Sequence, residues 1–305
     1  MSQEPELVIT DAPHLITDGD STDLVMIDVI IALIPATLAS VYLFGLNSVR
    51  IILASVITAM LIEAVVLQRW SSLRDFFDDG SAAVTGLLLA LTLPPDVSPF
   101  LAAVGAALAI ILGKMMLGGL GNNLFNPALV GRGIMLALWP ASMTTFTDPV
   151  DGATAATALA GGDYSYWEMF LGSIPGSLGE TSALLLFLGG VYLFFRGRIG
   201  WKIPLSYIVT VGIFTPLMGG DVILHLFSGG LIMGAIYMAT DMVTSPVSSR
   251  GKLVFGFGCG FLTIIIRMYA TLPEGVTYAI LIMNALVPLL DKLLRRRAFG
   301  EVETE

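Results

Sequence analysis

Long apolar runs alternate with short polar segments along this chain, and the pattern predicts a bundle of membrane-spanning helices. A helix needs about 20 residues to cross about 30 Å of hydrocarbon. One shorter run, Ser81–Leu93, ends at Pro94 and Pro95 and is interpreted as a broken span. The other candidate spans are Leu24–Phe44, Val49–Leu67, Phe100–Met116, Ile134–Pro140 with the half-turns before it, Ser182–Phe195, Ile203–Met218, Val222–Thr240, Leu253–Tyr269 and Val276–Leu290. Together they predict an all-α integral membrane protein with about ten transmembrane helices.

The two halves of the chain carry similar patterns. Residues 86–94 read GLLLALTLP and precede a Gly-rich span and then Asn126, while residues 234–246 read GAIYMATDMVTSP and precede a Gly-rich span and then Asn284. An odd number of spans, five per half, inverts the second half relative to the first. This favours two inverted five-helix repeats with broken helices. The alternative is that Gly, Ala and Pro recur without a repeat, as they do in many membrane helices.

Composition supports a membrane location. The chain has 305 residues, of which 55% are hydrophobic and 13% charged, with a mean hydropathy of +0.85, whereas soluble domains have about 25% charged residues. The net charge is -9, but the acids concentrate in the two ends and in the loop 141–181, where water can solvate them. We therefore expect no nucleic-acid partner.

The basic residues predict the orientation, because Lys and Arg are retained on the cytoplasmic side. With a cytoplasmic N-terminus Arg50 and Arg267 fall on the wrong side. The residues on the expected side are Arg69, Arg74, Lys114, Arg196, Arg198, Lys202, Arg250, Lys252, Lys292, Arg295, Arg296 and Arg297. The predicted order is an acidic cytoplasmic tail (1–23), a first repeat (24–140), an extracytoplasmic loop (141–181), a second repeat (182–292) and a cytoplasmic tail (293–305).

Several cofactor classes do not suit this composition on chemical grounds. Cys259 is the only cysteine, so the chain has no internal disulfide and cannot ligate an iron–sulfur cluster through cysteines. His14 and His225 are the only histidines and have no neighbour at ligand spacing, so no metal or haem site is expected. If the protein carries electrons, its carrier must be organic.

The most distinctive polar stretch is 151–159, DGATAATAL, within the loop 141–181. That loop contains no Lys or Arg, which predicts that it faces outward. Taken on its own, the stretch reads as an exposed Ala/Thr-rich connection that begins with the Asp151-Gly152 turn.

The stretch nevertheless resembles the flavinylation motif of the family that includes the B subunit of the sodium-pumping NADH:quinone reductase and the D subunit of the Rnf complex. In that motif an Asp is followed by Ser or Thr, Gly, Ala and a Thr esterified through the phosphate of FMN. The matching residues here are Asp151, Thr154, Ala156 and Thr157, and Ala155 stands where the family has Gly. The resemblance continues in residues 12–14 (APH), 118–127 (GGLGNNLFNP) and 240–246 (TDMVTSP). It therefore covers essentially the whole chain.

The resemblance implies a subunit of an ion-translocating ferredoxin:NAD+ oxidoreductase (Rnf) complex in a prokaryotic plasma (inner) membrane. This subunit would carry covalent FMN on Thr157 and relay electrons coupled to Na+ or H+ transport, without an NAD site of its own. Implied partners are the other Rnf subunits, including a second flavinylated subunit, and a flavin transferase during maturation. Two alternatives stay open: the B subunit of the quinone reductase, and a channel or carrier for small solutes without redox chemistry.

Other polar residues at membrane depth are candidates for binding. Asn122, Asn123 and Asn126 could contact a buried polar ligand, and the resemblance implies a riboflavin; equally, they could only cap a half-helix. Intramembrane acids are candidates for an ion path, and here they are Asp28, Glu63 and Asp241. The aromatic residues Tyr164, Tyr166 and Trp167 favour a membrane-interface belt over packing on a flavin ring. Arg267 could snorkel toward water or pair with a partner subunit.

Overall fold

The structure is a computed structural model that describes residues 21–68, 80–149, 152–180, 182–270 and 275–294. The predicted tails 1–23 and 293–305, the APH motif and Asp151 therefore lie wholly or mostly outside the described residues. The elements of the first half are α1 (Thr22–Phe44), α2 (Leu46–Val66), α4 (Ser81–Leu91), α5 (Pro99–Leu108), the π-helical η1 (Ala109–Lys114), η2 (Met115–Leu117) and α6 (Pro127–Leu138).

The segment between the halves folds into short elements. They are α7 (Pro140–Thr144), β1 (Phe146–Thr147), β2 (Thr154–Ala155), η3 (Ala158–Ala160) and α8 (Tyr166–Leu171). The elements of the second half are α9 (Ala183–Phe195), α10 (Lys202–Leu217), α11 (Val222–Phe227), α12 (Leu231–Met233), the π-helical η4 (Gly234–Met238), α13 (Ser249–Tyr269) and α14 (Val276–Leu294). Apart from the two-residue strands, the regular structure of the described residues is helical.

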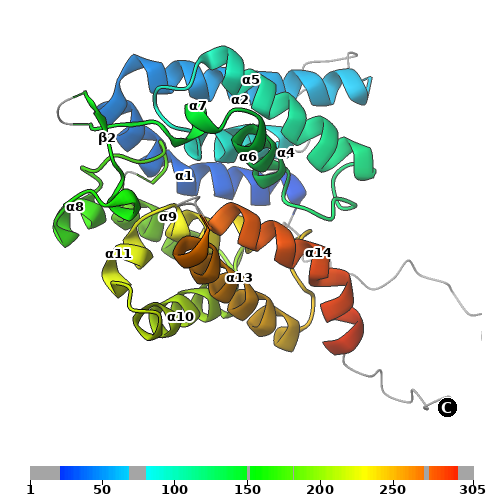
Figure 1. Cartoon of the computed structure of the whole chain (residues 1–305). Helices are drawn as coiled ribbons and strands as arrows, with labels where there is room; N and C mark the ends of the chain where they lie inside the picture. The colour runs from blue at the N-terminus through cyan, green and yellow to red at the C-terminus, as the bar shows by residue number, and fades with distance from the viewer. Residues whose placement is uncertain (1–20, 69–79, 150–151, 181, 271–274, 295–305) are drawn as a thin grey trace, which may run out of the picture.

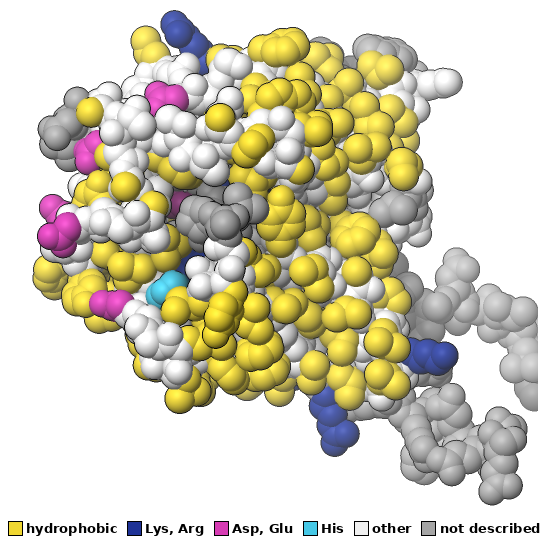
Figure 2. Space-filling model, viewed as in Figure 1, with side chains coloured by type: hydrophobic (Ala, Val, Ile, Leu, Met, Phe, Trp, Pro, Cys, Tyr) yellow, Lys and Arg dark blue, Asp and Glu magenta, His cyan; other side chains and the backbone are white. Residues whose placement is uncertain are grey.

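Long apolar helices confirm that this is an α-helical membrane protein. In the described part of the chain, α1, α2, α13 and α14 are long and apolar enough to cross a membrane, and α4, α5 with η1, α6, α9 and α10 are shorter apolar helices. Hydrophobic side chains cover much of the surface in Figure 2. Leu38 on α1 is 64% exposed and Phe195 on α9 is 83% exposed. Apolar side chains in such positions suit a surface in contact with lipid.

The helices pack in a regular order. In the first half α2 contacts α4 and α5, and α6 packs on η1; in the second half α10 contacts α13, and α13 contacts α14. Contacts between the halves include those of α1 with α9 and of α6 with α14. Figure 1 shows α2 and α5 at one side of the molecule and α10 and α13 at the other.

Helix α4 is the broken span that the sequence predicts. Nearly all of its residues are buried, and the loop after α8 satisfies its carboxyl end. The Leu178 and Gly179 amides donate to the carbonyls of Leu93 (3.0 Å) and Leu91 (2.6 Å). A helix can end inside a membrane protein only where other protein groups satisfy its free carbonyls, and this loop does so.

The prediction of one continuous helix over Val222–Thr240 is wrong. The chain turns sharply after α11 at Gly229 and Gly230, whose φ angles are +64° and +67°, and it resumes as α12 and η4. Residues with side chains rarely adopt such φ angles, so the two glycines permit the break. The half-helix that follows is buried throughout, because other helices of the chain surround it. The apolar sequence of residues 222–240 does not show which helices pack around it, so the break could not be predicted from that sequence.

Candidate functional site

Thr157 lies in the segment between the two halves, directly after a small ladder. Strands β1 and β2 pair antiparallel, with Thr154 opposite Thr147. Thr157 follows in extended conformation (φ -66°, ψ 161°), and its carbonyl accepts hydrogen bonds from the amides of Ala160 and Gly162. Among the described residues, the Thr157 hydroxyl has no hydrogen-bond partner. Thr154 and Ala156 are exposed, and Thr157 is half-buried.

A hollow of about 390 Å³, measured to its open mouth, lies beside Thr157. Its walls are mostly apolar and include Phe146, Ile174 and Phe227. Gly176 and Gly229 contribute backbone surface without side chains, and Glu180 is the acidic residue of the lining. The segment therefore forms a shallow, largely apolar seat next to a free hydroxyl.

The neighbouring aromatic residues have different roles. The Tyr164 hydroxyl donates to the Ala156 carbonyl at 3.2 Å and so braces the predicted motif. Tyr166 donates to Asp221 at 2.6 Å, and this bond raises the pKa of Tyr166 and lowers that of Asp221. Trp167 is 72% exposed. Exposure of Trp167 agrees with a residue at a membrane interface, whereas Tyr164 belongs to the loop itself.

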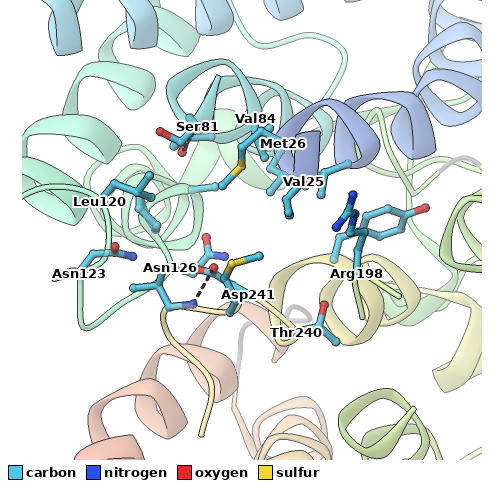
Figure 3. Close-up of a pocket in the computed structure, with 18 of the residues that line it drawn as sticks. Val25, Met26, Ser81, Val84, Leu120, Asn123, Asn126, Arg198, Thr240 and Asp241 are labelled. Carbon is cyan, nitrogen blue, oxygen red and sulfur yellow. Dashed lines mark hydrogen bonds between the residues drawn. The ribbon is translucent and has the colours of Figure 1, made fainter. Parts of the chain in front are cut away.

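A larger cavity of about 810 Å³ lies deeper, between the two halves (Figure 3). Val25 and Met26 of α1 lie across it from Asn126 and Asp241. The lining also includes Ser81, Val84, Lys114, Leu120, Asn123, Arg198, Tyr237 and Thr240. Its wall is thus drawn from both halves and combines apolar side chains with amide and charged groups.

The three predicted asparagines do not act alike. Asn126 caps α6 by accepting from the Leu129 amide and donates to the Met238 carbonyl at 3.4 Å, so the predicted capping role is present. Asn123 is 5% exposed, and its Oδ1 atom has no hydrogen-bond partner among the described residues. Asn122 is exposed and only donates to the Gly118 carbonyl. The structure therefore brings Asn123 and Asn126 to the cavity but leaves Asn122 outside its lining.

A second asparagine joins the halves at this point. The backbone amide of Asn126 donates to Asn284 Oδ1 at 3.2 Å, and Asn284 Nδ2 donates to the Thr244 carbonyl at 2.9 Å. Asn126 and Asn284 stand at matching places in the two sequence patterns. The contact therefore ties the α6 end of one half to α14 of the other.

Two of the three acidic candidates are held in ion pairs. Asp28 accepts from Arg196 (3.2 Å), Arg198 (2.6 Å) and the Tyr192 hydroxyl (2.7 Å). Glu63 accepts from Lys114 at 2.8 Å with both oxygen atoms, and both side chains are buried. The sequence analysis missed these partners because each lies on a distant helix.

The third acid, Asp241, follows η4 at the cavity. It accepts from the Val243 amide at 3.3 Å and the Thr244 hydroxyl at 3.1 Å. No group of three His, Cys, Asp or Glu side chains that could hold a metal ion occurs among the described residues.

Arg267 has a role that the sequence analysis did not anticipate. It lies in the last turn of α13 and donates to the carbonyls of His225 (2.6 Å), Ser228 (2.8 Å) and Gly229 (3.0 Å). These carbonyls end α11, where a cation is favourable. The guanidinium therefore binds within this chain instead of snorkelling.

Comparisons with known proteins agree along nearly the whole chain. The sequence profile of the NQR2, RnfD, RnfE family matches residues 8–300. The D subunit of the proton-translocating ferredoxin:NAD(+) oxidoreductase complex of Clostridium ljungdahlii is 41% identical, over 96% of this chain and 96% of the relative. The D subunit of the Na(+)-translocating ferredoxin:NAD(+) oxidoreductase complex of Acetobacterium woodii is 41% identical, over 97% and 96%. The D subunit of an ion-translocating oxidoreductase complex of Stutzerimonas stutzeri is 38% identical, over 92% of each. The chain belongs to the NQR2, RnfD, RnfE family.

Proposed function

We propose that this chain is the D subunit of an ion-translocating ferredoxin:NAD+ oxidoreductase complex, embedded in a prokaryotic plasma membrane. The observation that carries the proposal is identity of 41% along nearly the full length of two relatives that are named as such subunits. Of these two names, one specifies protons and the other Na+, so the coupling ion is left open. The partners are the other subunits of the complex, a second flavinylated subunit among them, and a flavin transferase acts during maturation. This chain itself does not bind NAD.

The proposal includes FMN attached to Thr157 by a phosphoester. Its support is the motif ending at Thr157, a half-buried hydroxyl without a hydrogen-bond partner in the described residues, and the hollow beside it. Apolar walls and bare glycine backbone suit a flat aromatic ring. When bound, FMN supplies the electron chemistry, while the protein positions the ring and sets its electrostatic surroundings.

The test of this attachment compares two threonines of the same loop. Thr157→Val keeps the β-branched shape but removes the oxygen that forms the ester, so we expect a folded chain without the FMN mass. Thr154→Val serves as the matched control and keeps at least part of the FMN. Intact-mass measurement of chains produced with a flavin transferase distinguishes them. An FMN adduct that persists on Thr157→Val, or disappears only with Thr154→Val, contradicts the assignment.

We also propose ten spans in two inverted repeats, with residues 24–140 and 182–292 as the repeats and 141–181 as the outward loop. Support comes from the two buried half-helices, α4 and α12 with η4, and from the equivalent packing of α2 on α5 and α10 on α13. The pairs α1 with α9 and α6 with α14 are those that a twofold axis between the halves would bring together.

Both termini are cytoplasmic in this proposal. In Figure 2 acidic side chains gather at the edge where β2 and α8 lie in Figure 1, away from the C-terminus. Cysteines introduced near Thr157, after replacement of Cys259, should react with an impermeant reagent only from outside. Labelling only from the cytoplasm contradicts both the orientation and the cofactor assignment.

For the inner cavity we propose a non-covalent flavin, riboflavin by the family resemblance. The largely apolar walls and the unpartnered Asn123 Oδ1 suit an aromatic ring with hydrogen-bonding edges. Asn123→Leu should reduce the flavin extracted by denaturation while the covalent flavin stays, and Asn122→Leu is the matched control outside the lining. Equal extractable flavin in both variants contradicts the proposal.

An ion path through this subunit remains part of the proposal, with Asp28, Glu63 and Asp241 as its candidates. Two experiments separate the alternatives. A flavin on the purified chain excludes a carrier without redox chemistry. Reduction of the complex by ferredoxin, and not by NADH as primary donor, excludes the quinone-reductase subunit.

A further inference from the structure

Arg267 lies directly behind the hollow beside Thr157. Gly229 lines that hollow, and its carbonyl accepts from the Arg267 guanidinium at 3.0 Å. A Cβ atom built on Gly229 would meet Leu159 of the Thr157 loop and would lie 2.7 Å from Arg267 Nη2. The guanidinium and the loop therefore lie against the same side of one glycine.

The position of this charge is tightly determined. Three hydrogen bonds to the carbonyls of His225, Ser228 and Gly229 orient the guanidinium. Gly229 carries no side chain that could separate it from the hollow, and the positive φ angle of Gly229 disfavours any other residue. Arginine also stays protonated at all ordinary pH values. A fixed positive charge thus lies behind Gly229, in the wall of the hollow.

Glu180 supplies a charge of opposite sign. It lines the same hollow, and its Oε2 atom accepts from the Ser177 amide. Its Oε1 atom lies 2.7 Å from a Cβ built on Gly230, the next residue after Gly229. A ring attached at Thr157 and lying over the hollow would therefore be near both the Arg267 cation and the Glu180 anion, which lie beside adjacent glycines of the break between α11 and α12.

We propose that Arg267 is a positioning residue that raises the reduction potential of the flavin attached to Thr157. This inference rests on the proposed function. Each electron that the ring takes from the donor adds one negative charge unless a proton from water follows it, and no bond to the protein forms or breaks. Charge near the pyrimidine edge of a flavin tunes its electronics. Arg267 favours the reduced ring by attraction, and Glu180 opposes it.

The test is a redox titration of the full-length flavinylated chain, monitored by flavin absorbance. The same titration of Thr157→Val is subtracted, so only the covalent flavin contributes. We expect Arg267→Gln to shift the ratio of oxidised to reduced flavin at least tenfold toward oxidised, which corresponds to a midpoint about 59 mV lower for a one-electron couple. Glu180→Gln should shift the midpoint in the opposite direction. Arg50→Gln, the same charge change at the start of α2 and outside the lining of the hollow, should leave it unchanged.

A second variant keeps the proposal testable if Arg267→Gln does not fold. In Arg267→Lys the midpoint of the first electron should match the wild type at neutral pH and fall above about pH 10, where lysine loses its charge. The wild-type midpoint should fall less in that range, because arginine remains charged. An unchanged midpoint in Arg267→Gln, or parallel pH profiles of wild type and Arg267→Lys, overturns the inference while the FMN assignment stands. Absence of FMN from Thr157 in the wild type overturns the proposed function itself.

Discussion

The buried pair between Lys114 and Glu63 allows a quantitative prediction. Lys114 Nζ lies 2.8 Å from Glu63 Oε2, and the side chains are 2% and 9% exposed. At this distance two unit charges attract by about 6 kcal/mol for an effective dielectric constant of about 20. Much of that attraction offsets the cost of removing both groups from water. The net effect of the pair is therefore small, but the loss of one partner exposes the full cost of the other.

We expect Glu63→Gln and Lys114→Met each to destabilise the chain by about 3–5 kcal/mol, because each leaves one buried charge without its partner. The double variant should recover most of this loss, since glutamine and methionine fill similar volumes without a charge. At about 2 °C per kcal/mol, each single variant should lower Tm by roughly 6–10 °C.

The chain provides its own reporter for this measurement. Cys259 is its only cysteine and is completely buried in α13, so a thiol-reactive fluorogenic dye reacts only as the protein unfolds. The double-mutant cycle is read from the four melting temperatures. If the Tm of the double variant falls by the sum of the two single decreases, the two side chains are not coupled, and the electrostatic reasoning is refuted.

Two further predictions concern the break between α11 and α12 and the amino-terminal cap of α11. Gly230→Ala should destabilise the chain by more than about 1 kcal/mol, because it forces a side chain into a positive φ angle and against Glu180. The control, Gly212→Ala, adds a methyl group in open space within α10 and should stabilise the chain by about 0.5–1 kcal/mol. Equal changes in melting temperature in the thiol-dye assay would contradict this prediction. The Asp221 side chain caps the amino-terminal end of α11, and its pKa in the folded protein is lowered. The ionised carboxylate therefore stabilises α11 above the ordinary carboxyl pKa of 3.8, and this stabilisation is lost as pH falls through the lower folded-state pKa. Removal of the hydrogen bond in Tyr166→Phe brings the Asp221 pKa back toward 3.8, so α11 should open at a higher pH than in the wild type, still below about 3.8, in hydrogen exchange. Identical profiles would exclude the bond.

The position of most apolar helices could be predicted from the sequence alone. Hydrocarbon thickness imposes a length of about 20 apolar residues, and the observed α1, α2, α13 and α14 follow the predicted runs within a few residues. The break after α4 was also predictable, because Pro94 and Pro95 cannot continue a helix. The resemblance to a flavinylation motif predicts Thr157 from local residue order, which needs no tertiary contact, and this stays a prediction.

The interior of the second half required the tertiary structure. A single apolar run over 222–240 is compatible with one helix or with two, and only the surrounding helices make the buried break at Gly229 and Gly230 favourable. The same applies to α4, whose terminal carbonyls are satisfied by residues more than 80 positions away.

Partners of the polar groups were likewise decided by packing. The apolar runs identified Asp28 and Glu63 as intramembrane acids. Their basic partners, however, come from the end of α9 and from η1, and no sequence-spacing rule connects such distant positions. Arg267 violated the charge rule for orientation until the structure showed the carbonyls of α11 around it. The sequence by itself determines where a chain enters the membrane, because that depends on local hydrophobicity; which charges meet depends on contacts that form only when the helices pack.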